Sequence, residues 1–386
     1  MRKLFITMCE METVPYLPMG MTTELFGAPL YEHAFRKIKD ASNKIGLDVE
    51  FVRASSCDVP NTTDKINASF DDIVVFASPL AFLARGKDIE GALDYVIKND
   101  VGYSTVGSLR SLYLAVGQGK MLDGCEISSP AHFLATMNES GIMTFPAHFS
   151  DGEKSAPLTM LDYLKRVEEY RQELLDYLVM SGVKIDCRDG IIIAPNTEIR
   201  VGASILPSTV IGPMTRIKEN AIVGPNAQIT DSEIGEGCVV NSSIVISSEL
   251  EHDVKIAPFC TISGESRILS NVTVDSFTKL DSCMINPDVK ISTGAHLSEC
   301  NIGVGCIIGS GVVTVNFEGK KKNNIVKIND SAMIGNNATL VAPVIIGRGA
   351  FVGAGSTITD DVPQGALGIA REYQSNHEGW ARRRRK

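Results

Sequence analysis

Residues 193–229 read IAPNTEIRVGASILPSTVIGPMTRIKENAIVGPNAQI and carry an aliphatic residue at every sixth position. These aliphatic residues are Ile193, Ile199, Ile205, Ile211, Ile217, Val223 and Ile229. The pattern slips, then resumes from Ile256 to Leu280 and from Ile328 to Ile358. A period of six matches neither the α-helix nor the simple strand. It predicts a parallel β-helix of three flat sides, with the aliphatic residues inside and about nine coils over residues 190–359.

One polar segment, residues 315–324, interrupts the repeat and contains Lys320, Lys321 and Lys322 in succession. In a stack of coils, such a segment must leave the prism as a loop at a corner. Loops on rigid scaffolds often carry binding groups, and three lysines are suited to holding a phosphate. A loop that is only solvated is the alternative.

Upstream of the repeat, apolar spacing predicts a helix over residues 159–181, which Gly182 ends. Before it, buried strands alternate with helices, which favours a small α/β domain with a parallel sheet and a boundary near Pro157. The strands are expected at residues 4–6, 49–52 and 73–76, and the helices at 31–41 and 89–97. We therefore divide the chain into an α/β domain (1–157), a linker helix (158–182), the β-helix (183–370) and a tail (371–386).

Composition limits the partners that we expect. The 386 residues carry 37 Lys+Arg against 46 Asp+Glu, a formal net charge of −9, which disfavours nucleic acid. The basic run Arg382 to Lys386 is expected to be a solvated tail. Nine cysteines without a Cys-x-x-Cys pair indicate small buried hydrophobes in a reducing compartment and predict no metal site. Because no apolar run is long enough to cross a membrane, we expect a soluble cytoplasmic protein.

Several segments of the second half resemble, in order, the bacterial bifunctional GlmU family. Members of this family are N-acetylglucosamine-1-phosphate uridyltransferases and glucosamine-1-phosphate N-acetyltransferases, which serve UDP-N-acetylglucosamine biosynthesis. The resemblance covers about residues 160–386. It implies a homotrimer of left-handed β-helices, acetyl-CoA bound between neighbouring prisms, and attack of a sugar amine on the thioester. The segments are residues 181–186, 316–319, 340–344, 353–358, 370–371 and 378–380.

On the coenzyme side, the resemblance places five residues of this chain at the acetyl-CoA and substrate pocket. Asn316, Lys322 and Arg371 match loop and tail residues of that pocket, and Phe317 replaces a Tyr. Ser310 stands for a small residue whose backbone meets the acetyl group. Lys and Arg can meet the coenzyme phosphates, and Asn can bond an amide.

The sugar-phosphate side departs from the family pattern. Ser263 stands where a phosphate-binding Arg is expected, and Asp281 or Ser282 where a Lys is expected. Thr293 stands at the general-base His, beside the substrate. His296 stands at a Tyr, and a shift of three residues in the alignment would place it on the base. A polar residue at a coil corner is the alternative interpretation of His296.

A further departure on the same side is Ile307, which falls where an Asn is usual. Fewer phosphate-binding groups make glucosamine 1-phosphate less certain as the acceptor.

The first domain weakly resembles the Rossmann-like nucleotidyltransferase half of the same family. The segment Thr7 to Glu12 has no glycine to cradle a triphosphate and carries two carboxylates. Met19 stands at the catalytic Lys, and Ala77-Ser78 at the Gly-Asp that supplies a metal ligand. We therefore expect a degenerate domain that has lost nucleotidyl transfer, with no Mg²⁺.

The leading hypothesis is an acetyl-CoA-dependent N-acetyltransferase that acts on an amino sugar, its phosphate or a related acceptor. His296 is its candidate base. Two rivals stay open. In the first, both sites have decayed and leave a trimeric scaffold or regulatory protein. In the second, the first domain binds a sugar nucleotide without turning it over.

Overall fold

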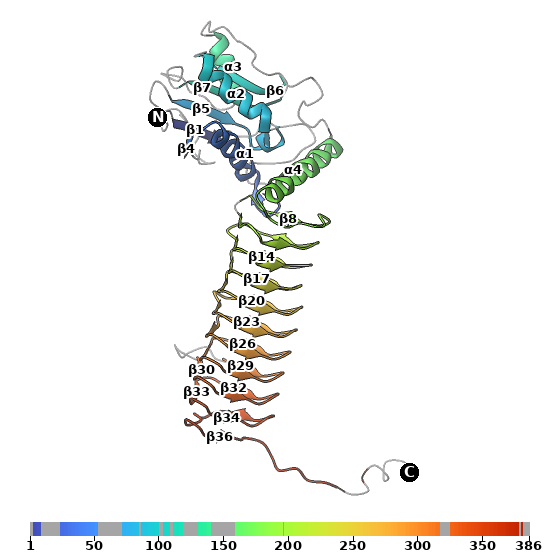
Figure 1. Cartoon of the computed structure of the whole chain (residues 1–386), viewed down its shortest axis with the longest axis vertical. Coiled ribbons are helices and arrows are strands. Elements are labelled where there is room, and N and C mark those ends of the chain that lie inside the picture. Colours follow the sequence, from blue (N-terminus) through green and yellow to red (C-terminus); the bar gives the residue numbers. More distant parts are fainter. Residues whose placement is uncertain are drawn as a thin grey trace. The chain divides into compact units, whose positions relative to one another are not determined.

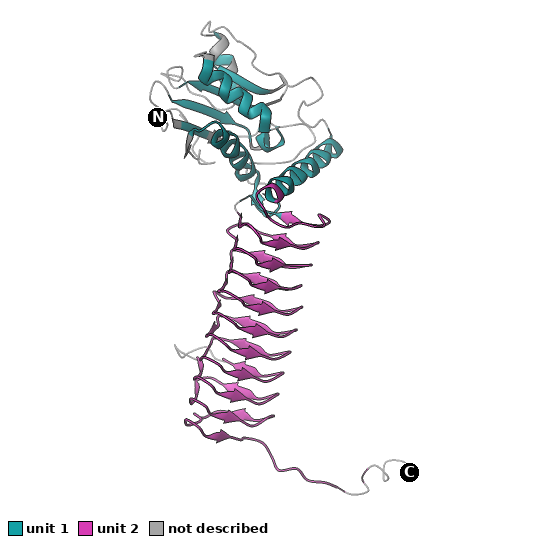
Figure 2. Ribbon diagram, viewed as in Figure 1, with its two compact units in different colours: residues 1–178, 193–196 teal, residues 179–192, 197–386 magenta. Residues whose placement is uncertain are grey.

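The computed structural model describes residues 3–8, 24–52, 72–84, 86–99, 103–108, 111–118, 130–139, 159–195, 197–316, 325–377 and 380. The chain forms two compact units (Figure 2). The first contains residues 1–178 and 193–196, and the second contains residues 179–192 and 197–386. The expected boundary at Pro157 lies outside the described residues. None of the described helices is long and apolar enough to cross a membrane.

The first unit is built on a five-stranded sheet in the order β4-β1-β5-β7-β6 (Figure 1). The three predicted strands, β1 (Lys3–Met8), β4 (Asp48–Val52) and β5 (Ile73–Ala77), are present and pair in parallel. The expected parallel pairing is confirmed for these three strands, but the sheet as a whole is mixed. β7 (Ser111–Gln118) runs antiparallel to β5 and to β6 (Tyr103–Ser108). Only two residues separate β6 from β7, and so short a link can join only antiparallel neighbours.

Helices complete the first unit, and the three predicted ones are confirmed. α1 buries Leu30, Ala34, Ile38 and Ala41, whose spacing of three or four residues places them on one face. This face belongs to the hydrophobic core that β1 and β5 also line. The elements are the hairpin β2 (Glu24–Leu25) and β3 (Ala28–Pro29), α1 (Leu30–Lys44), the 3₁₀ helix η2 (Pro79–Leu83), α2 (Gly86–Asn99), α3 (Pro130–Glu139) and α4 (Met160–Met180).

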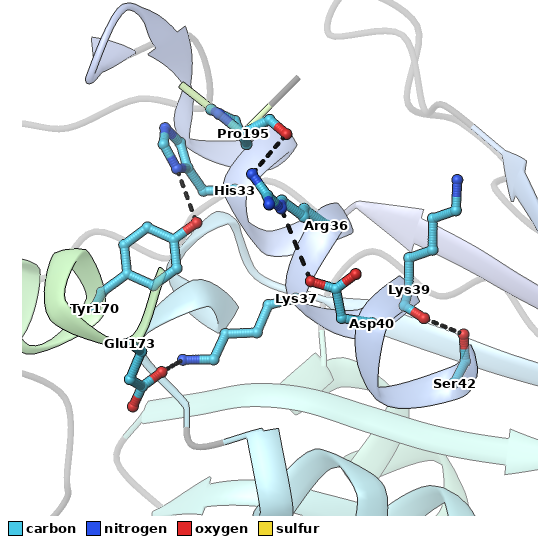
Figure 3. Close-up of polar contacts among 9 residues, drawn as sticks. All are labelled: His33, Arg36, Lys37, Lys39, Asp40, Ser42, Tyr170, Glu173 and Pro195. Atoms are coloured by element: carbon cyan, nitrogen blue, oxygen red, sulfur yellow. Dashed lines mark hydrogen bonds and ion pairs between the residues drawn. The ribbon is translucent and has the colours of Figure 1, made fainter. Parts of the chain in front are cut away.

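His33 of α1 is fully buried and connects three elements of the first unit (Figure 3). Its Nε2 lies 2.6 Å from the carbonyl oxygen of Leu25, and its Nδ1 lies 3.1 Å from the hydroxyl of Tyr170 in α4. A carbonyl only accepts, so Nε2 carries the proton and Nδ1 accepts from the Tyr170 hydroxyl. Burial lowers the pKa of His33 from 6.5 to about 4.

We expect the first unit to lose stability as the pH falls from about 6.5 to about 4. In this window the unfolded His33 binds a proton and the folded one does not, so the unfolded state is favoured by up to about 3 kcal/mol. Amide hydrogen exchange of α1 and α4 measures the effect. His33→Gln should flatten the pH dependence, whereas His132→Gln, on an exposed position of α3, should leave it unchanged. A pH dependence that survives in His33→Gln would contradict the assignment.

The second unit is a left-handed parallel β-helix whose coils stack along one axis (Figure 1). Its three sheets are named face A, face B and face C in the order in which each coil visits them. Face A holds β10 (Ser204–Ile205), β13 (Ile222–Val223), β16 (Val239–Val240), β19 (Lys255–Ile256), β22 (Thr273–Val274), β25 (Lys290–Ile291), β28 (Ile307–Ile308), β31 (Met333–Ile334), β34 (Phe351–Val352) and β36 (Leu367–Gly368). Face B holds β8 (Ile192–Ile193), β11 (Val210–Ile211), β14 (Gln228–Thr230), β17 (Ile244–Ile246), β20 (Thr261–Ser263), β23 (Lys279–Asp281), β26 (His296–Ser298), β29 (Val313–Val315), β32 (Thr339–Val341) and β35 (Thr357–Ile358). Face C holds β9 (Glu198–Ile199), β12 (Arg216–Ile217), β15 (Glu233–Ile234), β18 (Glu249–Leu250), β21 (Arg267–Ile268), β24 (Met284–Ile285), β27 (Cys300–Ile302), β30 (Val326–Ile328) and β33 (Val344–Ile346).

The interior of the β-helix consists of the aliphatic residues that the six-residue period singled out. All of them are buried except Ile199, which is half-buried. Each stacks on its equivalent in the next coil, as in the register Ile262, Leu280 and Leu297 on face B. Removing these columns of side chains from water supplies the main stabilisation of a fold whose strands are only two or three residues long.

The slips in the repeat arise at a shortened corner between faces B and C. After Ile229 and Leu280, the next inward residue follows five positions later, at Ile234 and Ile285. Only two residues turn these corners, and the first of each, Asp231 (φ 48°) and Ser282 (φ 55°), lies in the left-handed region. A tight turn with one positive φ keeps the coil closed with one residue fewer.

The interrupting segment lies where a corner loop was predicted. β29 of face B ends at Val315, and β30 of face C begins at Val326. Asn316 starts the corner, and residues 317–324 lie outside the described part of the chain. The loop is therefore inserted at the corner between faces B and C.

Five of the six cysteines that the structure describes are small buried hydrophobes, as predicted: Cys238, Cys260, Cys283, Cys300 and Cys306. Cys187, which precedes the first coil, is only half-buried, and none of the six forms a disulfide.

Candidate functional site

Three of the candidate residues lie along one edge of the prism, where each coil turns from face A to face B. We call this edge the A–B corner. Thr293 lies between β25 and β26, and its carbonyl oxygen accepts from the Gly311 N–H of the next coil at 3.0 Å. Ser310 lies beside Gly311. Arg371, in the tail, reaches the same edge because its Nη1 donates to the Ala354 carbonyl oxygen at 3.2 Å.

The backbone of Ser310 is fully engaged within the β-helix. Its N–H donates to Oδ1 of Asn336 at 3.0 Å, and its carbonyl oxygen accepts from the N–H of Asn337 at 2.7 Å. The expectation that this backbone meets an acyl group stays untested. Ser310 as a whole is half-buried.

The A–B corner changes character along the axis. At the position that needs a positive φ, it carries Phe259 (φ 65°) and Phe277 (φ 62°), followed by Gly294 (φ 74°) in the next coil. The two rings stack at 5.2 Å and are 64% and 59% exposed. No atom lies within 4 Å of a Cβ placed on Gly294. An exposed aromatic pair therefore adjoins a bare stretch of backbone beside Thr293.

Asn316 lies on a different edge, the B–C corner, where each coil turns from face B to face C. Its Nδ2 donates to the carbonyl oxygens of Ser298 at 2.7 Å and Glu299 at 3.2 Å. Its Oδ1 is buried and has no hydrogen-bond partner among the described residues. A buried carbonyl without a donor costs about 1–3 kcal/mol. The fold thus holds the side-chain amide of Asn316 in place. Its Oδ1 can still accept a hydrogen bond from a donor outside the described residues.

His296 lies on face B, between these two edges, and is exposed. The register places it between Lys279 of β23 and Val313 of β29. The sequence interpretation missed Lys279. Lys279 and His296 are 17 residues apart, which is the separation of neighbouring residues on successive coils in this part of face B. That separation can be recognised only once the strand register is known.

The residues that replace the expected phosphate-binding cations lie together. Ser263 and Asp281 are in register on face B, and the Ser263 hydroxyl donates to Oδ1 of Asp281 at 2.7 Å. Ser298 follows in the same column, and its carbonyl oxygen is one acceptor of the Asn316 amide. At these positions the column offers a hydroxyl and a carboxylate instead of two cations.

The described chain thus brings Thr293, Ser310 and Arg371 to one edge and Asn316 to the other, with His296 on the face between them. Phe317 and Lys322 lie outside the described residues. Among the described residues, no group of three or more His, Cys, Asp or Glu side chains could hold a metal ion.

Two family models match the second unit. The "GlmU-like, C-terminal hexapeptide" model matches residues 223–299, and the "Bacterial transferase hexapeptide (six repeats)" model matches residues 325–360. The bifunctional protein GlmU of Thermoanaerobacter pseudethanolicus is 42% identical over 156 residues, which are 40% of this chain and 34% of that protein. GlmU of Geobacillus sp. is 43% identical over 155 residues, with the same two shares. The C-terminal region is GlmU-like.

The chain spans about a third of the length of these curated relatives. Among solved structures, the UDP-N-acetylglucosamine acyltransferase from Campylobacter jejuni aligns with a TM-score of 0.32 and 16% identity, over 46% of this chain and 72% of that one. The GlmU-like region has the hexapeptide repeats and the β-helix of the acyltransferases. Its A–B and B–C corners are where the resemblance places the coenzyme and substrate residues.

Proposed function

We propose that the GlmU-like region transfers an acetyl group from acetyl-CoA to the amino group of a sugar, a sugar phosphate or a related acceptor. The observation that carries the proposal is the buried Oδ1 of Asn316, which has no hydrogen-bond partner among the described residues of a GlmU-like β-helix. An acceptor amine, or an amide of the coenzyme arm, supplies the N–H donor that this oxygen lacks.

The surfaces around the A–B corner suit acetyl-CoA. The bare backbone at Gly294 allows a thin chain to lie against the coil, and the exposed Arg371 can pair with coenzyme phosphates. Acetyl-CoA supplies the thioester. The amine nitrogen bonds to the acetyl carbon, the carbon–sulfur bond breaks, and the sulfur leaves as coenzyme A thiol.

His296 is the proposed general base, because it is the exposed histidine on face B between the two edges. Its imidazole accepts a proton from the attacking amine, and that proton passes to the leaving sulfur. Thr293 has no basic group at neutral pH and is proposed to contact the substrate. Lys279, beside His296 in register, is the cation available to an anionic group of the acceptor.

We further propose a homotrimer. In one chain the two edges of face B hold Asn316 and Ser310 apart, so the B–C corner of one copy must meet the A–B corner of another to bring them together. The exposed Phe259–Phe277 stack supports this, because exposed aromatic pairs are typical of surfaces that become buried.

The experiment is a thiol-release assay with acetyl-CoA and a panel of amino sugars and their phosphates, repeated with His296→Ala. We expect release with at least one acceptor and a loss of about 100-fold or more in the variant. Unchanged activity in His296→Ala would remove His296 as the base. No release with any acceptor would favour the second candidate, an inactive trimeric scaffold or regulatory protein, which the Ser263–Asp281 pair supports.

For the first unit we propose that nucleotidyl transfer has been lost. Ala77 is buried at the end of β5, and the Ser78 hydroxyl caps η2 by accepting from the Leu80 N–H. These residues stand where the resemblance expects a metal ligand. The segments at residues 9–12 and 19 lie outside the described part. Synthesis of a sugar nucleotide from UTP and a sugar phosphate with Mg²⁺ would contradict the proposal. Binding of a sugar nucleotide without turnover is compatible with it.

A further inference from the structure

The first unit contains a hollow of about 610 Å³ that no step above uses. The C-terminal half of α1, the start of α2 and the middle of α4 line it. Its volume lies within the range of small-molecule sites. The hollow is therefore large enough for a metabolite, and its chemistry depends on the charged side chains around it.

Four cations and three carboxylates line the hollow, an excess of one positive charge in a chain whose net charge is −9. The cations are Arg36, Lys37, Lys44 and Lys87, and the carboxylates are Asp40, Glu90 and Glu173. The cations form two groups. We call Arg36 and Lys37, which are mostly buried, the floor of the hollow, and Lys44 and Lys87, which are exposed, its mouth.

The floor is held in place by partners within the first unit (Figure 3). Arg36, 16% exposed, donates to the carbonyl oxygen of Pro195 at 2.9 Å. Lys37, 11% exposed, pairs with Glu173 at 2.5 Å and lies 5.2 Å from the centre of the Tyr170 ring. These contacts hold the two cations of the floor in place between α1 and α4.

The mouth carries the cations that a ligand can recruit. Lys44 is 63% exposed and pairs with Glu90 at 2.6 Å, a surface ion pair that contributes little to stability. Lys87 is exposed and makes no ion pair within the described part of the chain. Gly86 begins α2 here, so the first N–H groups of that helix open on the same side.

Two further features distinguish this hollow from an ordinary charged surface. The ring of Tyr177 is 51% exposed at its wall, with the Arg36 guanidinium 6.0 Å from its centre. Burial raises the pKa of the Asp40 carboxyl, although Arg36 and two lysines oppose the shift. The raised pKa of Asp40 eases its protonation, which would reduce the negative charge lining the hollow.

We propose that this hollow binds the phosphate group of a small phosphorylated ligand, with Lys44 and Lys87 on the phosphate and the Tyr177 ring against the organic part. A phosphate ester carries up to two negative charges and three acceptor oxygens. It can therefore replace Glu90 as the ion-pair partner of Lys44 and bind Lys87 at the same time. A monocarboxylate offers half the charge. Because the ligand would join α1, α2 and α4, its binding would stabilise the first unit.

Isothermal titration of the full chain with inorganic phosphate, glucose 1-phosphate and UMP tests the proposal. We expect at least one phosphate ester to bind, and Lys87→Glu combined with Lys44→Ala to weaken that binding at least tenfold. Tighter binding of UMP would identify a nucleotide as the ligand, and tighter binding of glucose 1-phosphate a sugar phosphate.

The control is Lys98→Ala, which removes an exposed lysine at the other end of α2, paired with Asp94 at 2.7 Å. It should bind as the unaltered chain does. Both mouth lysines are exposed, so the variants are expected to fold, and thermal unfolding checks this. Absence of binding at millimolar concentrations, or an equal loss in Lys98→Ala, would overturn the proposal.

Discussion

Asn316→Ala should lower kcat/KM for acetyl transfer by about 100-fold or more. The side chain has two distinct functions in the structure. Its Nδ2 secures the corner to Ser298 and Glu299, and its buried Oδ1 accepts no hydrogen bond from the part of the chain that the structure describes. Removing one preorganised polar group that faces the reacting atoms typically costs 10²–10³ in rate. The thiol-release assay on the acceptor that the unaltered chain uses measures the effect.

The matched control is Asn286→Ala. The Nδ2 of Asn286 donates to the carbonyl oxygen of Ile302 at 2.8 Å and to Oδ1 of Asn301 at 3.3 Å, so it also ties one coil to the next, but between faces C and A. Both variants should lose comparable stability, and only Asn316→Ala should lose activity. Equal losses of activity would show that Asn316 acts only through the scaffold.

Gly235→Val should destabilise the second unit by about 3 kcal/mol and lower its thermal midpoint. A Cβ on Gly235 would lie 1.9 Å from the carbonyl oxygen of Glu251 and 2.7 Å from that of Leu250. Both atoms belong to the backbone of the next coil, and the Leu250 oxygen already accepts from the Gly235 N–H at 2.8 Å. Relieving the clash must therefore break backbone hydrogen bonds between the two coils. The loss of stability is accordingly expected at the upper end of the range for overpacked substitutions. Circular dichroism on heating measures the midpoint.

Gly349→Asn provides the comparison, because it changes a corner glycine in open space. Gly349 has φ 62° and no atom within 4 Å of an added Cβ. Asn220 (φ 56°) and Asn271 (φ 61°) occupy turns between the same two faces in a similar conformation. The change should cost less than about 1 kcal/mol, since Asn tolerates this region. A midpoint as low as that of Gly235→Val would mean that any corner glycine is required, and the clash argument would fail.

The β-helix was predictable because its core signal is local and repeated. Each inward position from Ile205 to Ile358 reports the same environment, so the pattern survives several slips. The slips had no explanation from sequence, because the two-residue corners at Asp231 and Ser282 depend on positive φ angles. In the first unit, the antiparallel arrangement was missed because the pairing of β7 with β5 is a long-range contact that no local period encodes, and β6 joins the sheet only through β7.

The candidate site was only partly predictable. A family resemblance singled out Asn316, Ser310 and Arg371. It could not reveal that the Asn316 oxygen is buried with no donor among the described residues, or that the Ser310 backbone is already engaged. Lys279 was missed because its neighbour His296 is adjacent only through the register. The hollow of the first unit was not expected, since α1, α2 and α4 meet there from distant parts of the sequence.

The loop inserted after Asn316 has a consequence for how this fold can change over evolutionary time. Successive coils normally pair residues 17 or 18 apart, as Ile285 with Ile302, whereas Asn301 pairs with Lys327 across the loop, 26 residues on. Closing the longer segment costs only about 0.4 kcal/mol more, because loop entropy grows with the logarithm of length. Contacts elsewhere remain between neighbouring coils, so the scaffold folds by local propagation whatever the loop contains. Insertions and substitutions there can therefore accumulate while the prism itself stays intact.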